Sequence, residues 1–328
     1  MNKNLLKLLR CPVTGQELKL EKAIYVDEKI KEGVLITMDN NKQYLIINFI
    51  PRFVPESNYA DNFGVQWNLF SKTQLDSFSG HKISENRFWL SNGLSPKDLD
   101  GKWVLDCGCG AGRFAEIALK AGANLVAIDF SNAVDACYRN LNIYPNLYLV
   151  QANIYELPFL KNSFDLVYSL GVLQHTPDVK KAFLNLPEML LPGGQLCVDF
   201  YEDTLKSKFL PKFWLRPITK RLNSKKLFIF LQNVTPGLLK ISIFLSCIPI
   251  LGNLLKRLVP VANYKGILPL DDTQLKEWAL LDTFDWLAPE YDNPQTEITV
   301  SKWFKIINFD NIEVFKKGHL IGRANKKV

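Results

Sequence analysis

A glycine-rich stretch at residues 104–114 constrains the fold of this chain more than any other feature. Apolar Val104 and Leu105 lead into Asp106, glycines follow at alternate positions 108, 110 and 112, and a helix-forming run covers 113–120. This pattern predicts a buried parallel strand that turns tightly into a helix. Glycines let the backbone approach a ligand closely and adopt positive φ, and the free N–H groups of the helix start point at the same place. The stretch therefore predicts a nucleotide-binding turn.

The glycine spacing separates two ligand classes. The dinucleotide fingerprint is G-x-G-x-x-G, but here Arg113 occupies the third glycine position and Gly112 comes one residue early. The pattern Asp-x-Gly-x-Gly-x-Gly resembles the first motif of class I S-adenosylmethionine (SAM)-dependent methyltransferases, in particular domains of the methyltransferase type 11/12-like group. The resemblance implies that Asp106 and the glycines face the amino acid part of SAM. A tight strand-to-helix corner without any ligand is the alternative for this stretch alone.

A second apolar run at 124–130 ends in Asp129. An acid at the carboxyl end of such a strand accepts hydrogen bonds from ribose hydroxyls. Asp129 is therefore predicted to hold the ribose; the alternative is that it caps a helix that starts near Ser131. A third strand at 147–150 leads to Asn153, where the family usually has an acid. Its amide oxygen can accept the same hydrogen bond from the adenine amino group, and Ile154 would contact the ring.

Residues 163–178 begin with a fourth strand, which is followed by a loop that carries Gln174 and His175, and this segment resembles the fourth motif of the same superfamily. Pro192-Gly193-Gly194 then turns into a fifth strand at 195–200. The resemblance implies a cofactor site built from these residues of the core: Asp106, Cys107, Gly108, Gly110, Gly112, Arg113, Asp129, Phe130, Asn153, Ile154, Leu170 and Gln174.

Residues 55–101 are rich in aromatic side chains and resemble the lid segment of a bacterial methyltransferase subfamily. Tyr59, Gln66, Trp67 and Arg87 are the predicted cofactor contacts there, and Arg87 is chosen because a guanidinium grips a carboxylate in a planar, bidentate way. Two other interpretations stay open: the aromatics at helical spacing pack one helix onto the core, and Arg87 is a surface arginine.

His175 is the first candidate for a catalytic base, because its loop lies where open α/β sheets bind ligands and a hydroxyl acceptor must lose a proton. The alternative is that His175 only shapes the cofactor pocket. Tyr201 and His319 are the further catalytic candidates, with Asp199 and His81 behind them.

Residues 1–54 predict a small β-rich module with strands at 18–26, 34–37 and 44–50 and turns at 29–33 and 39–41. Its first residues predict a short amphipathic helix. The module resembles the zinc-ribbon-like units that precede some methyltransferases, but Thr14 stands where a partner of Cys11 would be, so no metal site is predicted. The six cysteines show no paired spacing, which is typical of a reducing cytoplasm.

The predicted fold is an α/β, Rossmann-like, seven-stranded sheet of order 3-2-1-4-5-7-6. A SAM-binding core covers 102–200, an insertion covers 201–295, and a helix at 296–307 with strands at 312–315 and 320–323 completes the core within 296–328.

The insertion contains a strongly basic block. Residues 204–265 carry twelve Lys or Arg and no Asp or Glu; because the whole chain has a net charge of +7, the rest of the chain has a net charge of 7 − 12 = −5. The apolar run at 234–255 approaches the length of a membrane span, but prolines, glycines and Lys240 interrupt it. A helical cap over the substrate pocket is the preferred interpretation, with peripheral contact to an anionic membrane through 204–265 as a variant of it; a purely structural cap and a true span are the alternatives.

The predicted function is a SAM-dependent methyltransferase, with O-methylation preferred, whose acceptor is a small molecule or an envelope glycan or lipid-linked sugar. An RNA methyltransferase is the first alternative, although an RNA groove shows exposed aromatics among its charges and the basic block instead mixes charge with apolar runs. A SAM-binding or membrane-associated scaffold is the non-enzyme alternative. The predicted location is the cytoplasm, with peripheral attachment at the inner face of the membrane as a variant, and the predicted assembly is a monomer or a dimer.

Overall fold

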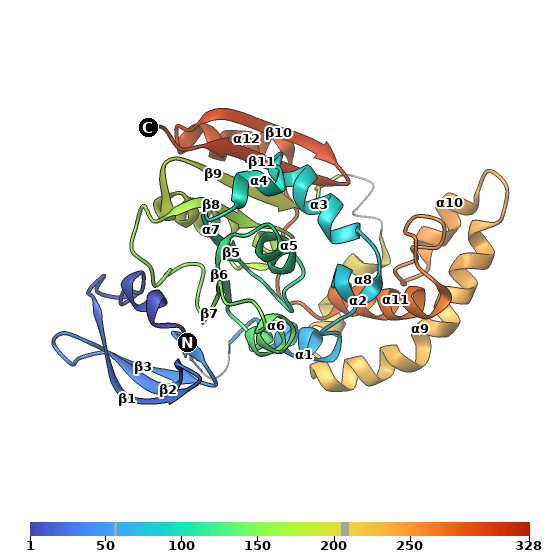
Figure 1. Cartoon of the computed structure of the whole chain (residues 1–328). Coiled ribbons are helices and arrows are strands. Elements are labelled where there is room, and N and C mark those ends of the chain that lie inside the picture. Colours follow the sequence, from blue (N-terminus) through green and yellow to red (C-terminus); the bar gives the residue numbers. More distant parts are fainter. Residues whose placement is uncertain (56–57, 205–209) are drawn as a thin grey trace.

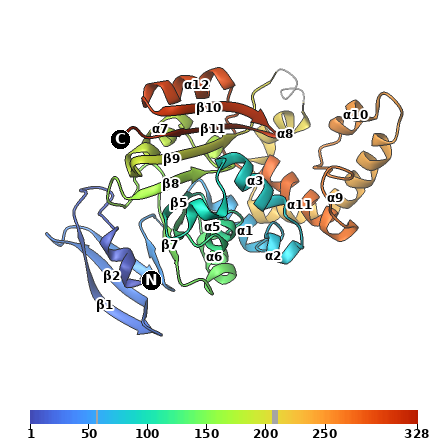
Figure 2. The ribbon, with the colours of Figure 1, turned by 45° about the horizontal axis from the view of Figure 1, so that its top comes forward.

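A computed structural model describes residues 1–55, 58–204 and 210–328. Across these residues eleven strands form one sheet of order β1-β2-β3-β4-β7-β6-β5-β8-β9-β11-β10, and helices cover it on both faces (Figures 1 and 2). The strands are β1 (Leu18–Val26), β2 (Lys29–Thr37), β3 (Gln43–Ile47), β4 (Ile50–Arg52), β5 (Trp103–Cys107), β6 (Asn124–Asp129), β7 (Leu147–Gln151), β8 (Phe164–Ser169), β9 (Leu190–Phe200), β10 (Asp310–Lys317) and β11 (His319–Asn325).

The core of the sheet runs from β7 to β10, and its strands read 3-2-1-4-5-7-6 in chain order. β5 lies at the centre, parallel to β6 and β8, and β11 is antiparallel to both β9 and β10. Successive side chains of β5 point to opposite faces: Val104 belongs to one hydrophobic cluster, and Leu105 and Cys107 belong to the other. Burial on both faces explains the continuous apolar runs of these strands.

The helices of the core and of the lid segment are short. They are α1 (Asp61–Leu69), α2 (Asp76–Ser79), α3 (Ile83–Asn92), α4 (Pro96–Leu99), α5 (Ala115–Lys120), α6 (Ala133–Leu141), α7 (Val179–Asn185) and α12 (Glu297–Ile306). α5 begins two residues after Arg113, because the glycine turn continues through position 112 with positive φ. Phe88 of α3 and Phe114 before α5 pack in the same buried cluster, which fastens the lid segment to the core.

The N-terminal module extends the core sheet instead of forming a sheet of its own. β4 pairs with β7 in parallel through Arg52 and Gln151, and β3, β2 and β1 follow in antiparallel order. The expected turn at 29–33 is wrong, because Lys29–Thr37 is one strand and the chain reverses at Asp27 and Glu28, both with positive φ. The expected strand at 44–50 is split into β3 and β4 by Asn48 and Phe49, also with positive φ. The expected first helix is a 3-10 turn at Lys3–Lys7.

The insertion forms a helical cap beside the sheet: α8 (Pro211–Thr219), α9 (Ser224–Ser246), α10 (Gly252–Leu255) and α11 (Asp272–Leu287) (Figure 1). α9 continues through Pro236 and Gly237, which interrupt the apolar run of the sequence but do not end the helix. Both residues are on its exposed side, where a curved helix tolerates a missing backbone hydrogen bond. Its buried stripe includes Leu227 and Leu231, which pack against Phe284 and Leu287 of α11. Residues 205–209 of the basic block lie outside the described residues.

Candidate active site

A cavity of about 730 Å³ lies at the carboxyl end of the core sheet. The segments after β5, β6, β7, β8 and β9 line one side of it, which is where parallel sheets of this type bind ligands. α1 and α3 close a second side, and the cap supplies the remainder through the start of α8, residues 256–264 and α11. The cavity therefore reaches from the glycine turn into the inserted segment without a wall between them.

The turn after β5 has little room for a side chain at its glycine positions 108 and 110. Gly108 has φ +96°, and a Cβ there would lie 2.4 Å from Val172. Gly110 has φ +52°, and a Cβ there would lie 3.1 Å from the indole nitrogen of Trp67. Trp67 belongs to α1, so the predicted lid helix lies directly over the turn. The close approach of Trp67 explains why the second glycine is needed in addition to the tight turn itself.

Asp129 lies at the carboxyl end of β6 and lines the cavity. Its Oδ1 accepts hydrogen bonds from the amide N–H and the hydroxyl of Ser131, at 2.8 and 2.7 Å, and its Oδ2 accepts from the amide N–H of Gly110, at 3.0 Å. Burial raises the pKa of Asp129, and these hydrogen bonds oppose that effect. A carboxylate oxygen can accept two hydrogen bonds, so Oδ2 retains one position for a ligand hydroxyl. The local turn and a ribose contact are thus compatible.

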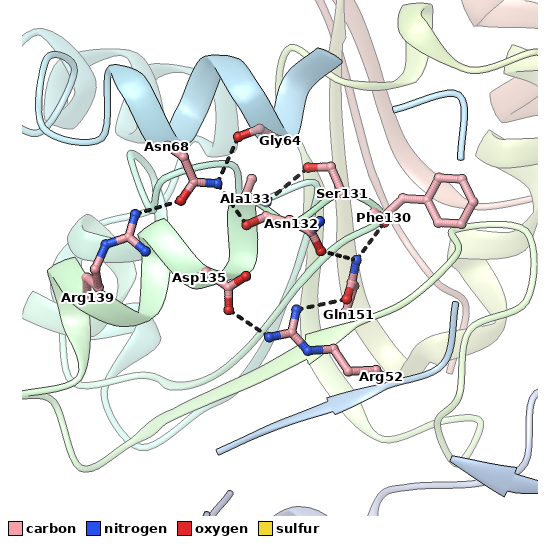
Figure 3. Close-up of polar contacts among 10 residues, drawn as sticks. All are labelled: Arg52, Gly64, Asn68, Phe130, Ser131, Asn132, Ala133, Asp135, Arg139 and Gln151. Atoms are coloured by element: carbon pink, nitrogen blue, oxygen red, sulfur yellow. Dashed lines mark hydrogen bonds and ion pairs between the residues drawn. The ribbon is translucent and has the colours of Figure 1, made fainter. Parts of the chain in front are cut away.

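Helix α1 is tied to the segment after β6 by a polar network (Figure 3). Asn68 donates to the carbonyl groups of Gly64 and Asn132, at 2.8 and 3.1 Å, and accepts from Arg139 of α6 at 2.6 Å. On the other side of the segment, Arg52 donates to Gln151 and to Asp135, at 2.8 and 2.6 Å. Since Asp129 and Phe130 line the cavity and residues 131–132 adjoin them, this network fixes the lid segment relative to the Asp129 carboxylate.

Several predicted cofactor residues line the cavity as expected from the sequence. They are Tyr59, Gln66, Trp67, Arg87, Gly108, Gly110, Arg113, Asp129, Phe130, Ile154 and Leu170. Tyr59 packs on Phe130 with ring centroids 5.1 Å apart, which makes an aromatic side wall. The three catalytic candidates His175, Tyr201 and His319 line the same cavity, whereas His81 lies elsewhere and contacts Gln274.

The remaining predicted cofactor residues are not on the cavity wall: Asp106, Cys107, Gly112, Asn153 and Gln174. Gly112 instead allows α6 to pack closely, since a Cβ there would lie 2.6 Å from Leu141. The side-chain oxygen of Asn153 accepts from the amide of Tyr155, so it is already used within its own turn. Burial raises the pKa of Asp106 to about 8, and its Oδ2 has no hydrogen-bond partner within the described residues. The side-chain oxygen and nitrogen of buried Gln174 likewise have no hydrogen-bond partner within the described residues.

Arg87 is paired within the protein. Its Nε and Nη2 donate to Oδ2 of Asp199, at 3.2 and 2.6 Å, and Oδ1 of Asp199 accepts from the amide N–H of Gly171. Burial raises the pKa of Asp199, but the Arg87 guanidinium and His319 outweigh burial, so its pKa lies below the usual value. The edge of the guanidinium that would have gripped a cofactor carboxylate is thus turned toward β9. Asp199 is a positioning group for Arg87 and for the loop after β8.

Arg113 is also held by the lid segment. Its Nε donates to the hydroxyl of Ser84 at 2.9 Å and its Nη1 donates to Gln74 at 3.0 Å, and the guanidinium lies 5.5 Å from the ring of Trp278 in the cap. Burial lowers the pKa of Arg113 to about 10, so it remains a cation at neutral pH. Arg113 therefore joins the glycine turn, the lid segment and the cap at one point.

His175 lies between the cofactor side and the cap. Its Nδ1 is 3.0 Å from the carbonyl oxygen of Tyr291, and its ring contacts Phe63 and Tyr201. A carbonyl oxygen can only accept, so Nδ1 carries the hydrogen and Nε2 of the neutral ring has a free lone pair. Burial lowers the pKa of His319 to about 4, with Arg87 adding to the effect, and His319 is neutral at pH 7.

The sequence-based prediction missed the polar residues that the cap places on the cavity: Tyr264, Asp282 and Asp285, together with Lys212, Lys256, Arg257 and Asn263. Asp285 accepts from the hydroxyl of Tyr201 at 3.2 Å and from Gln66 at 3.4 Å, and Tyr264 donates to Asp282. Burial raises the pKa of Asp282 to about 7. The available signal was two acids three residues apart in the largely apolar second half of α11, a spacing that places both on one helix face.

Residues 105–198 match the family described as methyltransferase domain. This segment is a SAM-dependent methyltransferase domain. A tRNA U34 carboxymethyltransferase of Pseudomonas putida is 36% identical over 135 residues, which are 39% of this chain and 42% of that protein. A ubiquinone biosynthesis O-methyltransferase of Rhizobium etli is 30% identical over 122 residues, 36% of this chain and 49% of that protein. The chain thus spans less than half the length of these curated relatives.

The solved magnesium protoporphyrin IX methyltransferase of Synechocystis PCC 6803 aligns over 82% of this chain and 97% of its own, with 14% identity and a TM-score of 0.44. The methyltransferase domain begins within β5 and ends within β9, so neither the lid segment nor the cap belongs to it. The cavity therefore has two kinds of wall: the matched segment supplies the glycine turn and Asp129, and segments outside it supply the opposite side.

The methyltransferase domain fits SAM by its donor set. The turn offers backbone without side chains at Gly108 and Gly110, Asp129 offers a buried acceptor, and Phe130, Ile154 and Leu170 offer apolar contacts for a ring. The cavity volume of about 730 Å³ lies within the range of about 300–1,000 Å³ that is usual for ligand pockets.

Proposed function

We propose that this protein is a methyltransferase that transfers the methyl group of SAM to a hydroxyl group of a small-molecule or lipid-linked glycan acceptor. The observation that carries the proposal is the continuous cavity, because it joins the glycine turn and Asp129 to His175, Tyr201 and the cap. When bound, SAM supplies an electrophilic methyl group on a neutral leaving group. The protein then has to align the acceptor, exclude water and accept one proton.

Each group has a task in this proposal. Asp129 and the glycine turn hold the nucleoside part, and Tyr59 and Trp67 of the lid segment exclude water above it. Nε2 of His175 accepts the proton of the acceptor hydroxyl, while the carbonyl of Tyr291 holds the ring orientation through Nδ1. Tyr201 and Asp285 supply hydrogen-bonding groups on the acceptor side.

The names of the relatives leave the acceptor class to experiment. One relative is named a tRNA U34 carboxymethyltransferase and another a ubiquinone biosynthesis O-methyltransferase, and both align with this chain. RNA is therefore the second candidate acceptor, and it is favoured by the twelve basic residues of 204–265. The small-molecule or lipid-linked acceptor is preferred because the basic residues of the cap stand among long apolar runs, a combination that suits an amphiphilic acceptor.

The test is incorporation of label from methyl-labelled SAM into separated lipid, glycan, RNA and small-molecule pools of the source cell. We expect label in the lipid, glycan or small-molecule pool, and His175→Gln to lower the transfer rate about 100-fold or more with unchanged SAM affinity. His81→Gln is the matched control, because His81 lies outside the cavity. Label in RNA alone would overturn the acceptor class, and full activity of His175→Gln would overturn the assigned base.

A further inference from the structure

The outermost part of the cap exposes a large apolar surface. Residues 240–258, here called the cap tip, form the end of α9, the following turn and α10, and both ribbon views place them far from the sheet (Figures 1 and 2). Ile250 is 99% exposed, and most other large apolar side chains of the tip are more than half exposed: Ile241, Phe244, Leu251, Leu254 and Leu258. Contiguous exposed apolar side chains of this kind mark an interaction site.

We propose that the cap tip docks onto an anionic lipid bilayer. Its charged residues are Lys240, Lys256 and Arg257, and residues 204–265 contain no acid. Within the part of the chain that the structure describes, none of the three cations has an ion-pair partner. Apolar side chains next to unpaired lysine and arginine suit the boundary between acyl chains and anionic headgroups.

Helix α9 extends to the cap tip while one of its faces stays packed against the protein. Among the described residues, α9 is the one helix that is long enough and apolar enough to cross a membrane. However, its stripe of Leu227, Leu231 and Leu239 is buried against α11 and the segment after α10. Inserting α9 across a bilayer would strip this packing from α11. A helix held by one face to the protein, with its outer face apolar and basic, lies on a membrane instead of spanning it.

Two other occupants fit the cap tip less well. A symmetric dimer through the tip would bring together two surfaces that carry cations and no acids, so the two copies would repel each other. An RNA site would expose several aromatic rings for base stacking, whereas Phe244 is the one aromatic residue among 240–258.

Docking would also orient the cavity. Lys256 and Arg257 line it as well as belonging to the tip, so an amphiphilic acceptor in the bilayer would enter beside them. This consequence rests on the proposed function, but the docking itself does not, because vesicle binding requires neither SAM nor an acceptor.

Co-sedimentation of the full chain with vesicles tests the proposal. We expect binding to vesicles of equal parts phosphatidylcholine and phosphatidylglycerol, and much weaker binding to phosphatidylcholine alone. The double variant Ile250→Asp with Leu254→Asp should lower the partition coefficient on anionic vesicles by about tenfold or more. Ile143→Asp with Ile298→Asp is the matched control, because it alters two equally exposed apolar residues of the core.

Unchanged thermal melting shows that each variant is folded, since all four positions are exposed. The proposal is overturned if the tip variant binds anionic vesicles as strongly as the control variant. It is also overturned if the wild-type protein does not bind vesicles and instead retains RNA or dimerises through the tip. Methyl transfer measured in the same samples separates this result from the proposed function: loss of vesicle binding with transfer retained on a soluble acceptor refutes neither the enzyme nor its site.

Discussion

The core and the cap differ in how their charged groups near the cavity are held. In the core, charged groups have partners at short range: Arg87 lies 2.6 Å from Asp199, and Asp129 accepts from two backbone amides and a hydroxyl. In the cap, the acids Asp282 and Asp285 have no ion-pair partner among the described residues, and they share the cavity wall with the cations Lys212, Lys256 and Arg257. The outer surface of the cap remains apolar at the tip.

This difference indicates which part of the molecule is specific for which ligand. Groups with fixed backbone and side-chain partners are pre-organised, so the core suits one invariant ligand. The cap side offers carboxyl and phenol groups whose protonation responds to what lies beside them. The difference therefore predicts that changes in the core disturb stability and cofactor affinity, whereas changes in the cap disturb pH dependence and acceptor or membrane binding.

The largest effect is expected at the ion pair between lid segment and core. Arg87→Ala leaves the carboxylate of Asp199 buried and unpaired, which should lower the free energy of unfolding by about 3–5 kcal/mol at pH 7. Because the folded pKa of Asp199 is depressed, its stabilisation is present above the unfolded pKa and is lost as the pH falls through the folded pKa. The difference from wild type should thus shrink in acid. Denaturant titration at several pH values measures it.

Lys265→Ala is the matched control in the cap. Lys265 and Asp272 form an exposed pair at 3.0 Å, so the loss should stay within about 1 kcal/mol. Equal losses in the two variants would contradict the contrast between core and cap.

A second, smaller effect is expected for the cofactor. Asp129→Ala removes the acceptor of the Gly110 amide and of the predicted ribose contact, and should weaken SAM binding by about 2–3 kcal/mol in isothermal titration calorimetry. Asp310→Ala, an exposed acid of β10, should leave the affinity unchanged. Wild-type affinity in Asp129→Ala would mean that the nucleoside does not lie at the end of β6.

The smallest effect is expected in the cap. Burial raises the pKa of Asp282 to about 7, so its favourable contribution is present below the unfolded pKa and is lost as the pH rises through about 7. Asp282→Asn keeps an oxygen for Tyr264 but cannot ionise, and it should gain about 1–2 kcal/mol relative to wild type between pH 4 and 8. Thermal melting across this range measures the gain. Exposed Glu290→Gln serves as control, and a parallel pH profile in both variants would contradict the assignment.

Much of the core could be predicted from the sequence. Apolar runs, glycine spacing and terminal acids are local signals. They predicted the strands that became β5 and β8, and they placed β6 and β7 within about a residue of their positions. The predicted lid residues Tyr59, Gln66 and Trp67 also line the cavity. The predicted turn at 29–33 is wrong, because the chain already reverses at Asp27 and Glu28, where φ is positive, and Gly33 lies within β2.

The site was less predictable where partners come from distant segments. Arg87 and Asp199 are 112 residues apart in the chain, and neither signals the other in the sequence. Likewise, the use of Asn153 within its own turn and the position of Gly112 against Leu141 depend on side-chain packing that has no local pattern.

The sequence by itself determined the strand–turn–helix unit of 104–120, the acid after β6 and the separation of a basic, apolar insertion from the core, because each is set by local backbone preference and composition. Only the tertiary structure decided that Trp67 covers Gly110, that Asp199 takes the guanidinium of Arg87, and that Asp282 and Asp285 complete the cavity. These pairings depend on how α1, α3 and α11 pack around the sheet edge, and packing joins residues that the chain keeps far apart.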